Sequence, residues 1–150
     1  MKKLSILLLL SILFALNGCN IEPSLGDKKV KKEYYTGGDI RSEFIMDDST
    51  GKNGILKEYR YHGILASTVR IRNGVNDGMK LVYDNNGLVI RRIPYVNGEI
   101  HGTVQDLYPN GDILATIPYT NGMRNGQAFS YSTDGSVYRS VTFKNNKIVN

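Results

Sequence analysis

Glycine recurs every 24 residues over most of this chain, and this period constrains the fold more than any other sequence feature. Eleven glycines fall into three columns of equal spacing: Gly54, Gly78, Gly102, Gly126; Gly63, Gly87, Gly111, Gly135; and Gly74, Gly98, Gly122, which Asn146 continues. Self-similarity at a fixed period of this length is the signature of stacked structural repeats. The sequence therefore predicts four copies of one supersecondary unit between Gly54 and Asn146.

Most of these glycines follow Asn or Asp, a dipeptide that favours chain reversal. A type I′ turn needs positive φ at both central residues, which Asn-Gly and Asp-Gly tolerate best, so we expect β-hairpins. The longer segments between turns, such as 88–96, carry apolar residues at alternating positions: Leu65, Val69, Ile71, Val89, Ile93, Tyr95, Ile113, Ile117, Tyr119, Val137, Val141 and Phe143. This period of two predicts strands with one buried face.

The repeats therefore predict an all-β, elongated antiparallel meander of tandem 24-residue β-hairpins with about 8–10 strands. Pro94 and Pro118 share one column inside the longer segments. Since proline cannot donate a ladder hydrogen bond, each is expected at a bulge or an unpaired position. Tyr35, Gly38 and Met46 form a weaker copy upstream, which we interpret as an N-terminal cap repeat.

The N-terminal residues combine a basic start, an apolar stretch and a cysteine soon after it. Lys2 and Lys3 precede an apolar stretch from Leu4 to Leu16, which is too short to span a bilayer and matches a signal-peptide core. The stretch ends in Leu16-Asn17-Gly18-Cys19, which is similar to a lipobox, and Cys19 is the only cysteine of the chain. The segment therefore resembles a bacterial lipoprotein signal peptide, which implies cleavage after residue 18 and lipidation of Cys19.

Three segments follow from this interpretation: a signal peptide over 1–18, a lipidated tether over 19–33 and a repeat domain over 34–150. Removing Lys2 and Lys3 lowers the formal net charge from +5 to +3. Four lysines cluster near the predicted anchor: Lys28, Lys29, Lys31 and Lys32. They could attract anionic headgroups, or they could be the solvated side chains of a polar tether.

Two segments of the repeat, 95–102 and 119–126, share an aromatic-x-Asn-Gly-x-x-x-Gly pattern with a further Asn-Gly or Asp-Gly downstream. On these segments the repeat pattern resembles the MORN-variant repeat family across roughly residues 54–146. The resemblance implies an elongated MORN-like antiparallel meander that binds or scaffolds a partner without catalysis. Many bacterial members of the family are labelled as antitoxins.

Residues suited to catalysis or metal binding are few. His62 and His101 are the only histidines, and they occupy different columns of the repeat, so no zinc site or nucleophile–base pair is expected. The carboxylates considered for acid–base chemistry do not recur in the repeat: Asp47, Asp48, Glu58, Glu99 and Asp106. We therefore predict a protein that is not an enzyme, with no catalytic residue, no cofactor and no metal.

The remaining candidate site is a surface of arginine and tyrosine, residue types that are common in binding hot spots. It consists of Arg70, Arg72, Arg91, Arg92, Tyr138 and Arg139. The alternative is that these arginines only keep an exposed sheet soluble and blunt its edges. Nucleic acid is not an expected partner, and the oligomeric state is left open.

The first functional hypothesis is an envelope lipoprotein, anchored to a membrane, whose repeats bind a protein or glycan. The alternatives are an immunity lipoprotein that neutralises a toxin at the envelope and, more remotely, an envelope hydrolase. Asn20 follows Cys19 in place of the aspartate associated with inner-membrane retention, which favours the outer membrane in a cell with two membranes.

Overall fold

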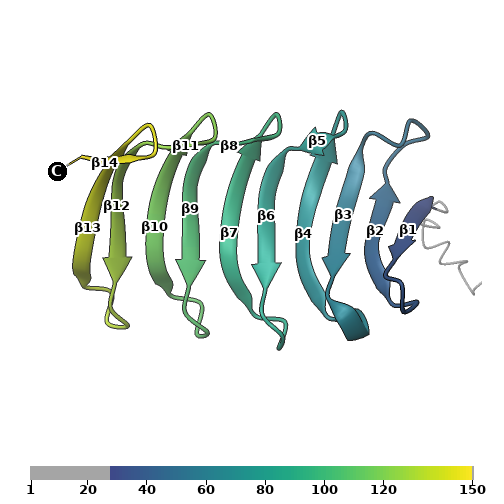
Figure 1. The fold of residues 1–150 in the computed structure, drawn as a ribbon, viewed down its shortest axis with the longest axis horizontal. Coiled ribbons are helices and arrows are strands. Elements are labelled where there is room, and N and C mark those ends of the chain that lie inside the picture. The colour runs from purple at the N-terminus through teal and green to yellow at the C-terminus, as the bar shows by residue number, and fades with distance from the viewer. Residues whose placement is uncertain (1–27, 150) are drawn as a thin grey trace, which may run out of the picture.

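The computed structural model describes residues 28–149, which form one open antiparallel sheet (Figure 1). Neighbouring strands of the sheet follow one another in chain order, as a meander requires. Ten strands have five or more residues: β1 (Val30–Tyr34), β2 (Ile40–Met46), β3 (Gly54–Tyr59), β4 (Leu65–Arg72), β6 (Gly78–Tyr83), β7 (Val89–Val96), β9 (Gly102–Leu107), β10 (Ile113–Thr120), β12 (Gly126–Tyr131) and β13 (Val137–Lys144). The predicted all-β meander is confirmed.

Four further strands of two or three residues extend the hairpins at one end of the strands, at the top of Figure 1. We call this row of turns the type I′ edge and the row at the opposite strand ends the other edge. The four short strands are β5 (Val75–Asn76), β8 (Glu99–Ile100), β11 (Met123–Arg124) and β14 (Lys147–Val149). A 3₁₀ turn, η1 (Tyr61–Gly63), joins β3 to β4. The sheet therefore has 14 strands, and the short ones exceed the predicted 8–10 because two residues are too few to show alternation.

The turns at this edge have the predicted type I′ geometry. Asn97 and Gly98 have φ of 49° and 87°, and Asn121 and Gly122 have φ of 49° and 77°. The last turn reaches the same conformation without glycine, since Asn145 has φ of 49° and Asn146 of 68°. Asparagine tolerates this left-handed region better than other non-glycine residues, which explains why the column continues with Asn146.

The turns at the other edge are different, and the prediction of type I′ geometry there is wrong. In three of these loops only the glycine has positive φ, and its N–H donates to the carbonyl three residues earlier: Gly87 to Asp84 at 3.3 Å, Gly111 to Tyr108 at 2.9 Å and Gly135 to Ser132 at 2.9 Å. A register shift lies beside each loop, for example between the Val82–Arg91 and Tyr83–Val89 pairs. These are type I turns closed by a glycine bulge.

The glycine column of Gly54, Gly78, Gly102 and Gly126 provides the first residues of β3, β6, β9 and β12, and its last two members lie beside a bulge. The N–H of Asn125 donates to the Pro118 carbonyl at 3.0 Å, where β11 ends and β12 begins, so the missing N–H of Pro118 faces the interruption. A Cβ added to Gly126 would lie 3.0 Å from Pro118 Cγ, and one added to Gly102 would lie 3.2 Å from Pro94 Cγ. The predicted position of both prolines at a bulge is confirmed, and the glycines make room for their rings.

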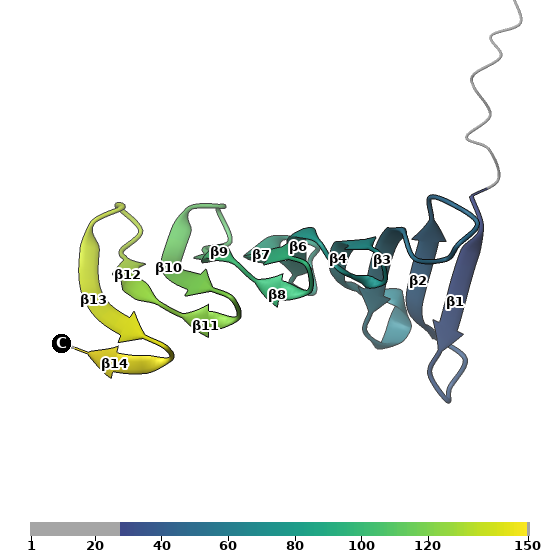
Figure 2. The ribbon, with the colours of Figure 1, turned by 90° about the horizontal axis from the view of Figure 1, so that it is seen from above.

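The sheet is a single layer (Figure 2). Within residues 28–149 no helix or second sheet covers either face. Side chains alternate between the two faces, and residues paired across strands share a face. We call the face that carries Leu56, Val69, Val104 and Ile117 the groove face, and the one that carries Thr68, Gln105 and Thr116 the opposite face.

The apolar stripe of the longer strands is only half-buried, because nothing packs over it. Of the twelve residues predicted to line a buried face, only Val69 is buried, with 2% of its surface exposed, while Ile113 and Val137 are exposed. The other buried apolar side chains of the described chain are Val104, Leu107 and Ala128. The face that was predicted to be buried is therefore only partly buried.

Hydrogen bonds between equivalent positions tie each hairpin to the next one along the sheet. At the type I′ edge the turn N–H reaches the preceding repeat: Gly98 to Asn76 O at 2.8 Å, Gly122 to Ile100 O at 2.9 Å and Asn146 to Arg124 O at 3.0 Å. At the other edge a side chain reaches the following repeat: Tyr35 to Tyr59 O, Arg60 to Tyr83 O and Tyr108 to Tyr131 O, each at 2.8 Å. The array is therefore linked along both edges.

The first hairpin agrees with the predicted cap repeat. Gly38 has φ of 92° and donates its N–H to the Tyr35 carbonyl at 2.9 Å, as in the later loops. However, β1 begins at Val30, inside the segment 19–33 that was predicted as tether. The sheet therefore begins four residues before the predicted start of the repeat domain at residue 34. The pairing of Lys31 with Phe44 and of Lys32 with Glu43 extends the sheet to these lysines.

The predicted signal peptide (1–18), Cys19 and the first part of the tether lie outside the described residues. Within residues 28–149 no helix is long and apolar enough to cross a membrane.

Candidate functional site

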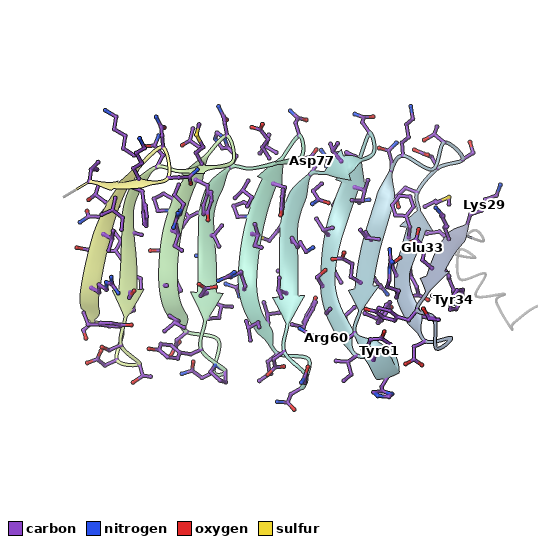
Figure 3. All side chains as sticks on the ribbon, viewed as in Figure 1. Lys29, Glu33, Tyr34, Arg60, Tyr61 and Asp77 are labelled. Carbon is purple, nitrogen blue, oxygen red and sulfur yellow. The ribbon has the colours of Figure 1, made fainter. Side chains whose placement is uncertain are left out.

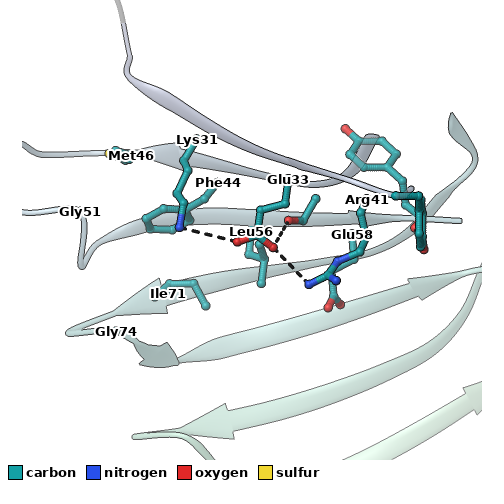
Figure 4. A pocket seen from close by; sticks show the side chains of 13 residues that line it. Lys31, Glu33, Arg41, Phe44, Met46, Gly51, Leu56, Glu58, Ile71 and Gly74 are labelled. Atoms are coloured by element: carbon teal, nitrogen blue, oxygen red, sulfur yellow. Dashed lines mark hydrogen bonds and ion pairs between the residues drawn. The ribbon is translucent and has the colours of Figure 1, made fainter. Parts of the chain in front are cut away.

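A concave site lies on the groove face over β1 to β4, and we call it the N-terminal groove (Figure 4). It has a volume of about 700 Å³, which is within the range of ligand-binding clefts. Four apolar side chains line it: Phe44, Met46, Leu56 and Ile71. Since Phe44 pairs with Leu56 across β2 and β3, strand register brings these residues together from three separate strands.

A carboxylate network borders the apolar part of the groove. Glu33 accepts hydrogen bonds from Arg41 Nη2 at 3.2 Å and Ser42 Oγ at 3.3 Å, and Lys31 Nζ lies 3.6 Å from it (Figure 4). Glu58 accepts from Lys80 Nζ at 2.7 Å and from a neighbouring serine hydroxyl. Because the Lys80 ammonium favours the ionised carboxylate, the pKa of Glu58 is lowered. The groove thus offers charges of both signs beside an apolar floor.

Tyrosines mark the end of the groove near the 3₁₀ turn. Tyr35 and Tyr59 line the groove, and the Tyr35 ring stacks on Tyr61 with 4.2 Å between ring centroids. Figure 3 shows Tyr61 beside Arg60 at the edge of the sheet. The Tyr59 hydroxyl donates to Glu43 at 2.7 Å, and burial together with this carboxylate raises the pKa of Tyr59 to about 12. The Tyr59 phenol is therefore a neutral hydrogen-bond donor at physiological pH.

Two smaller hollows lie on the same face further along the sheet. The first has a volume of about 360 Å³ and contains Ile93 and Tyr95 beside the Arg91–Asp106 ion pair. The second has a volume of about 210 Å³ and is lined mainly by apolar residues, among them Ile117. The cross-strand partners of these residues place both hollows on the groove face. The groove face is therefore hollowed at three places along the array.

The six residues of the predicted arginine and tyrosine surface do not form one patch. Arg91 and Arg92 are consecutive in β7 and so lie on opposite faces. Pairing places Arg139 with Arg91 on the groove face, and Arg70 with Arg92 on the opposite face.

Most of these side chains already have partners in the fold. Asp47 pairs with Arg70, Asp106 with Arg91, and Asp77 with Arg72 at 3.5 Å. Figure 3 shows Asp77 at the type I′ edge. Arg92 makes a long hydrogen bond of 3.4 Å to Gln105. Tyr138 is 63% exposed next to Arg139, and these two residues remain the open part of the predicted surface.

The lysines near the predicted anchor are spread over both faces and mostly paired. Lys28 lies 3.3 Å from Asp47, Lys31 lies 3.6 Å from Glu33, and Lys32 lies 3.1 Å from Glu43. Figure 3 shows Lys29 at the β1 end of the sheet. Such pairing weakens the attraction that a loose lysine cluster would have for an anionic surface.

The two histidines are far apart, in separate turns. His62 is 89% exposed with Nδ1 3.9 Å from Asp39, and His101 Nδ1 lies 3.1 Å from Asn121 Oδ1. Among residues 28–149 no three His, Cys, Asp or Glu side chains are grouped as a metal site would require. The absence of catalysis, cofactor and metal stays a prediction.

Sequence reasoning missed the N-terminal groove. The signal that could have found it is the alternation in β1 and β2, where Lys31 and Glu33 share a face with Ser42 and Phe44. That alternation is short and mixes charged with apolar residues, so it does not resemble a half-buried strand. Only the pairing of β1 with β2 and of β2 with β3 places these residues beside Leu56.

A single layer of linked hairpins defines a repeat protein with long open surfaces, a class that binds or scaffolds partners. The family model described as MORN repeat variant matches residues 100–121 and 124–145. These two matches support the assignment of the repeats to the MORN-repeat family and suggest a repeat-based binding or scaffold role. No curated protein and no solved structure matches the chain significantly.

Proposed function

We propose that this protein is a lipoprotein, anchored to an envelope membrane through Cys19, that binds an envelope protein or glycan on its groove face. The observation that carries the proposal is the row of three hollows on one face of an otherwise uncovered sheet. A partner that lies across the strands would contact all three hollows, whereas one that lies along a single strand would contact only one.

The sequence supports the anchoring part of the proposal. The apolar segment 4–16 ends three residues before the only cysteine of the chain, as in a lipobox. Two or three acyl chains on one residue hold a protein at a membrane far more firmly than a single myristoyl chain. The proposed anchor precedes β1, the strand that borders the N-terminal groove, so this groove would lie nearest to the membrane.

Crosslinking in living cells tests the binding part. Lys31 and Lys32 are consecutive, exposed residues of β1, and they lie on the groove face and on the opposite face respectively. A photoreactive amino acid at position 31 is expected to capture a discrete partner, and the same amino acid at position 32 serves as the matched control. Equal capture at both positions, or capture at neither, would contradict the choice of face.

Two further outcomes address the remaining parts of the proposal. Metabolic labelling with palmitate is expected to mark the protein and to fail on Cys19→Ser; an unlabelled wild-type chain would contradict the anchor. If the partner captured at position 31 were a toxin from a competing cell, the immunity alternative would replace the envelope partner.

A further inference from the structure

Seven Asn-Gly pairs lie in the part of the chain that the structure describes, and each carries a latent chemical reactivity. They begin at Asn53, Asn73, Asn86, Asn97, Asn110, Asn121 and Asn125. The deprotonated backbone nitrogen of the glycine can attack the Asn side-chain Cγ, and the amide nitrogen leaves as ammonia to give a cyclic succinimide. Water then opens the ring at either carbonyl and yields aspartate or isoaspartate.

Hydrogen bonds at the type I′ turns slow this reaction at their Asn-Gly pairs. The glycine nitrogen of each turn donates its hydrogen to a carbonyl of the preceding repeat, at 2.9 Å for Gly74, 2.8 Å for Gly98 and 2.9 Å for Gly122. Freeing that nitrogen requires separation of two repeats at this edge. Segments that open only together with their neighbours open rarely.

The two pairs next to strands β3 and β12 are also restrained. Asn53 uses both side-chain atoms, since its Oδ1 accepts from the Asn73 N–H at 2.9 Å and its Nδ2 donates to Asp48 at 2.6 Å. Gly126 pairs with Phe143 in the ladder between β12 and β13, and its preceding Asn125 donates its N–H to Pro118.

Two Asn-Gly pairs occupy equivalent loops at the other edge, and the hydrogen bonds that restrain them differ in length. Asn110 Oδ1 accepts from the Asp112 N–H at 3.0 Å, Asn110 Nδ2 donates to the Asp112 carboxylate at 2.8 Å, and the Gly111 N–H bond is 2.9 Å long. In the loop between β6 and β7 the corresponding bonds are longer. Asn86 Nδ2 lies 3.4 Å from Asp84, and the Gly87 N–H bond to the Asp84 carbonyl is 3.3 Å long.

We infer that Asn86–Gly87 is the preferred deamidation site of the folded protein. The loop is exposed, both bonds that restrain the reacting atoms are near the limit of hydrogen-bond distance, and they lie within one turn rather than between repeats. Opening this turn is therefore a local event that leaves the rest of the array intact. This inference is independent of the proposed partner and anchor.

The product changes the loop in two ways. Either product adds a carboxylate beside Asp84, whose own carboxylate accepts the N–H groups of Asn86 and Leu88 at 2.8 Å each. Isoaspartate also adds one carbon to the main chain of a turn that sets the β6–β7 register through the bulge at Val82 and Tyr83. The modification therefore weakens the junction between these strands.

The test is a comparison of deamidation rates within one molecule. The purified full chain is incubated folded at mildly alkaline pH, digested under acidic conditions, and analysed by mass spectrometry that separates aspartyl from isoaspartyl peptides. We expect Asn86 to react at least about tenfold faster than Asn97, and faster than Asn110. In guanidinium chloride the seven rates are expected to become similar, since every pair has the same reacting residues.

Loop variants provide the matched control. Asp112→Ala removes the carboxylate that holds the Asn110 amide, so it should raise the Asn110 rate towards that of Asn86 and leave Asn86 unchanged. Far-ultraviolet circular dichroism confirms that the variant stays folded. Equal rates at Asn86 and Asn97 in the folded chain, a faster reaction at Asn97, or an Asn110 rate unaffected by the variant would each overturn the inference.

Discussion

Replacement of Gly126 by alanine tests whether this glycine is needed to accommodate the ring of Pro118. Gly126 has φ of +114°, and a Cβ there would lie 3.0 Å from Pro118 Cγ. A non-glycine residue in this backbone region costs about 1–3 kcal/mol. The added methyl group against a proline ring costs about another 1–3 kcal/mol by overpacking. We therefore expect Gly126→Ala to lower the free energy of unfolding by about 2–6 kcal/mol.

Gly111→Ala is the matched control for the backbone part of this cost. Gly111 has φ of +92°, but an added Cβ would meet no heavy atom within 4 Å. Its replacement should therefore cost only the backbone strain of about 1–3 kcal/mol. The difference between the two variants measures the contact with the proline ring.

A double-mutant cycle isolates the same contact. Pro118→Ala alone should cost about 0.4–1 kcal/mol, because the unfolded chain gains freedom. In the Gly126→Ala background the same replacement also relieves the clash of about 1–3 kcal/mol, so there it should be neutral or stabilising. Unfolding in guanidinium chloride, followed by circular dichroism, gives the four free energies. A coupling energy within about 0.5 kcal/mol of zero would refute the reasoning.

Three further predictions concern stability. Tyr108→Phe removes the hydroxyl that donates to the Tyr131 carbonyl and should lower the free energy of unfolding by about 1 kcal/mol. Tyr95→Phe is the control, because it loses no hydrogen bond within residues 28–149 and should change the same free energy little. Val69→Ala removes a side chain that is 2% exposed and should lower the unfolding free energy by about 2–3 kcal/mol, as chemical denaturation can verify. The pKa of Glu58 is lower in the folded protein than in the unfolded chain, so its ionised carboxylate stabilises the fold above the unfolded pKa. This stabilisation is lost as the pH falls through the folded pKa. In thermal melts between pH 6 and pH 3, the Glu58→Gln variant should therefore lose less stability than the wild type.

The sequence was sufficient to predict the array of hairpins, because the patterns that indicate turns and strands are local. The period of 24 residues, the Asn-Gly turns and the alternation in segments such as 113–120 each depend on a few neighbouring residues. The MORN-variant resemblance predicted the same meander, and the family match covers its second half. The upstream cap repeat was recognisable for the same reason, although its first strand began earlier than predicted.

The predicted partner surface combined residues from both faces, although their places in the repeat already separate them. Arg91 and Arg139 are the fourth residues after their turn glycines and Arg70 is the seventh, so alternation puts Arg70 on one face and the other two on the opposite one. The sequence does not give the strand pairing that places Asp47 beside Arg70 and Asp106 beside Arg91.

The amino-acid sequence by itself determined that this chain turns back repeatedly and forms strands, because turn and strand preferences are properties of short segments. The tertiary structure alone decided which Asn-Gly pairs become type I′ turns and which become bulges, since that depends on the strand opposite. It also decided that one uncovered face carries the N-terminal groove. A groove exists only where β1 to β4 lie side by side, and a linear pattern cannot specify that arrangement.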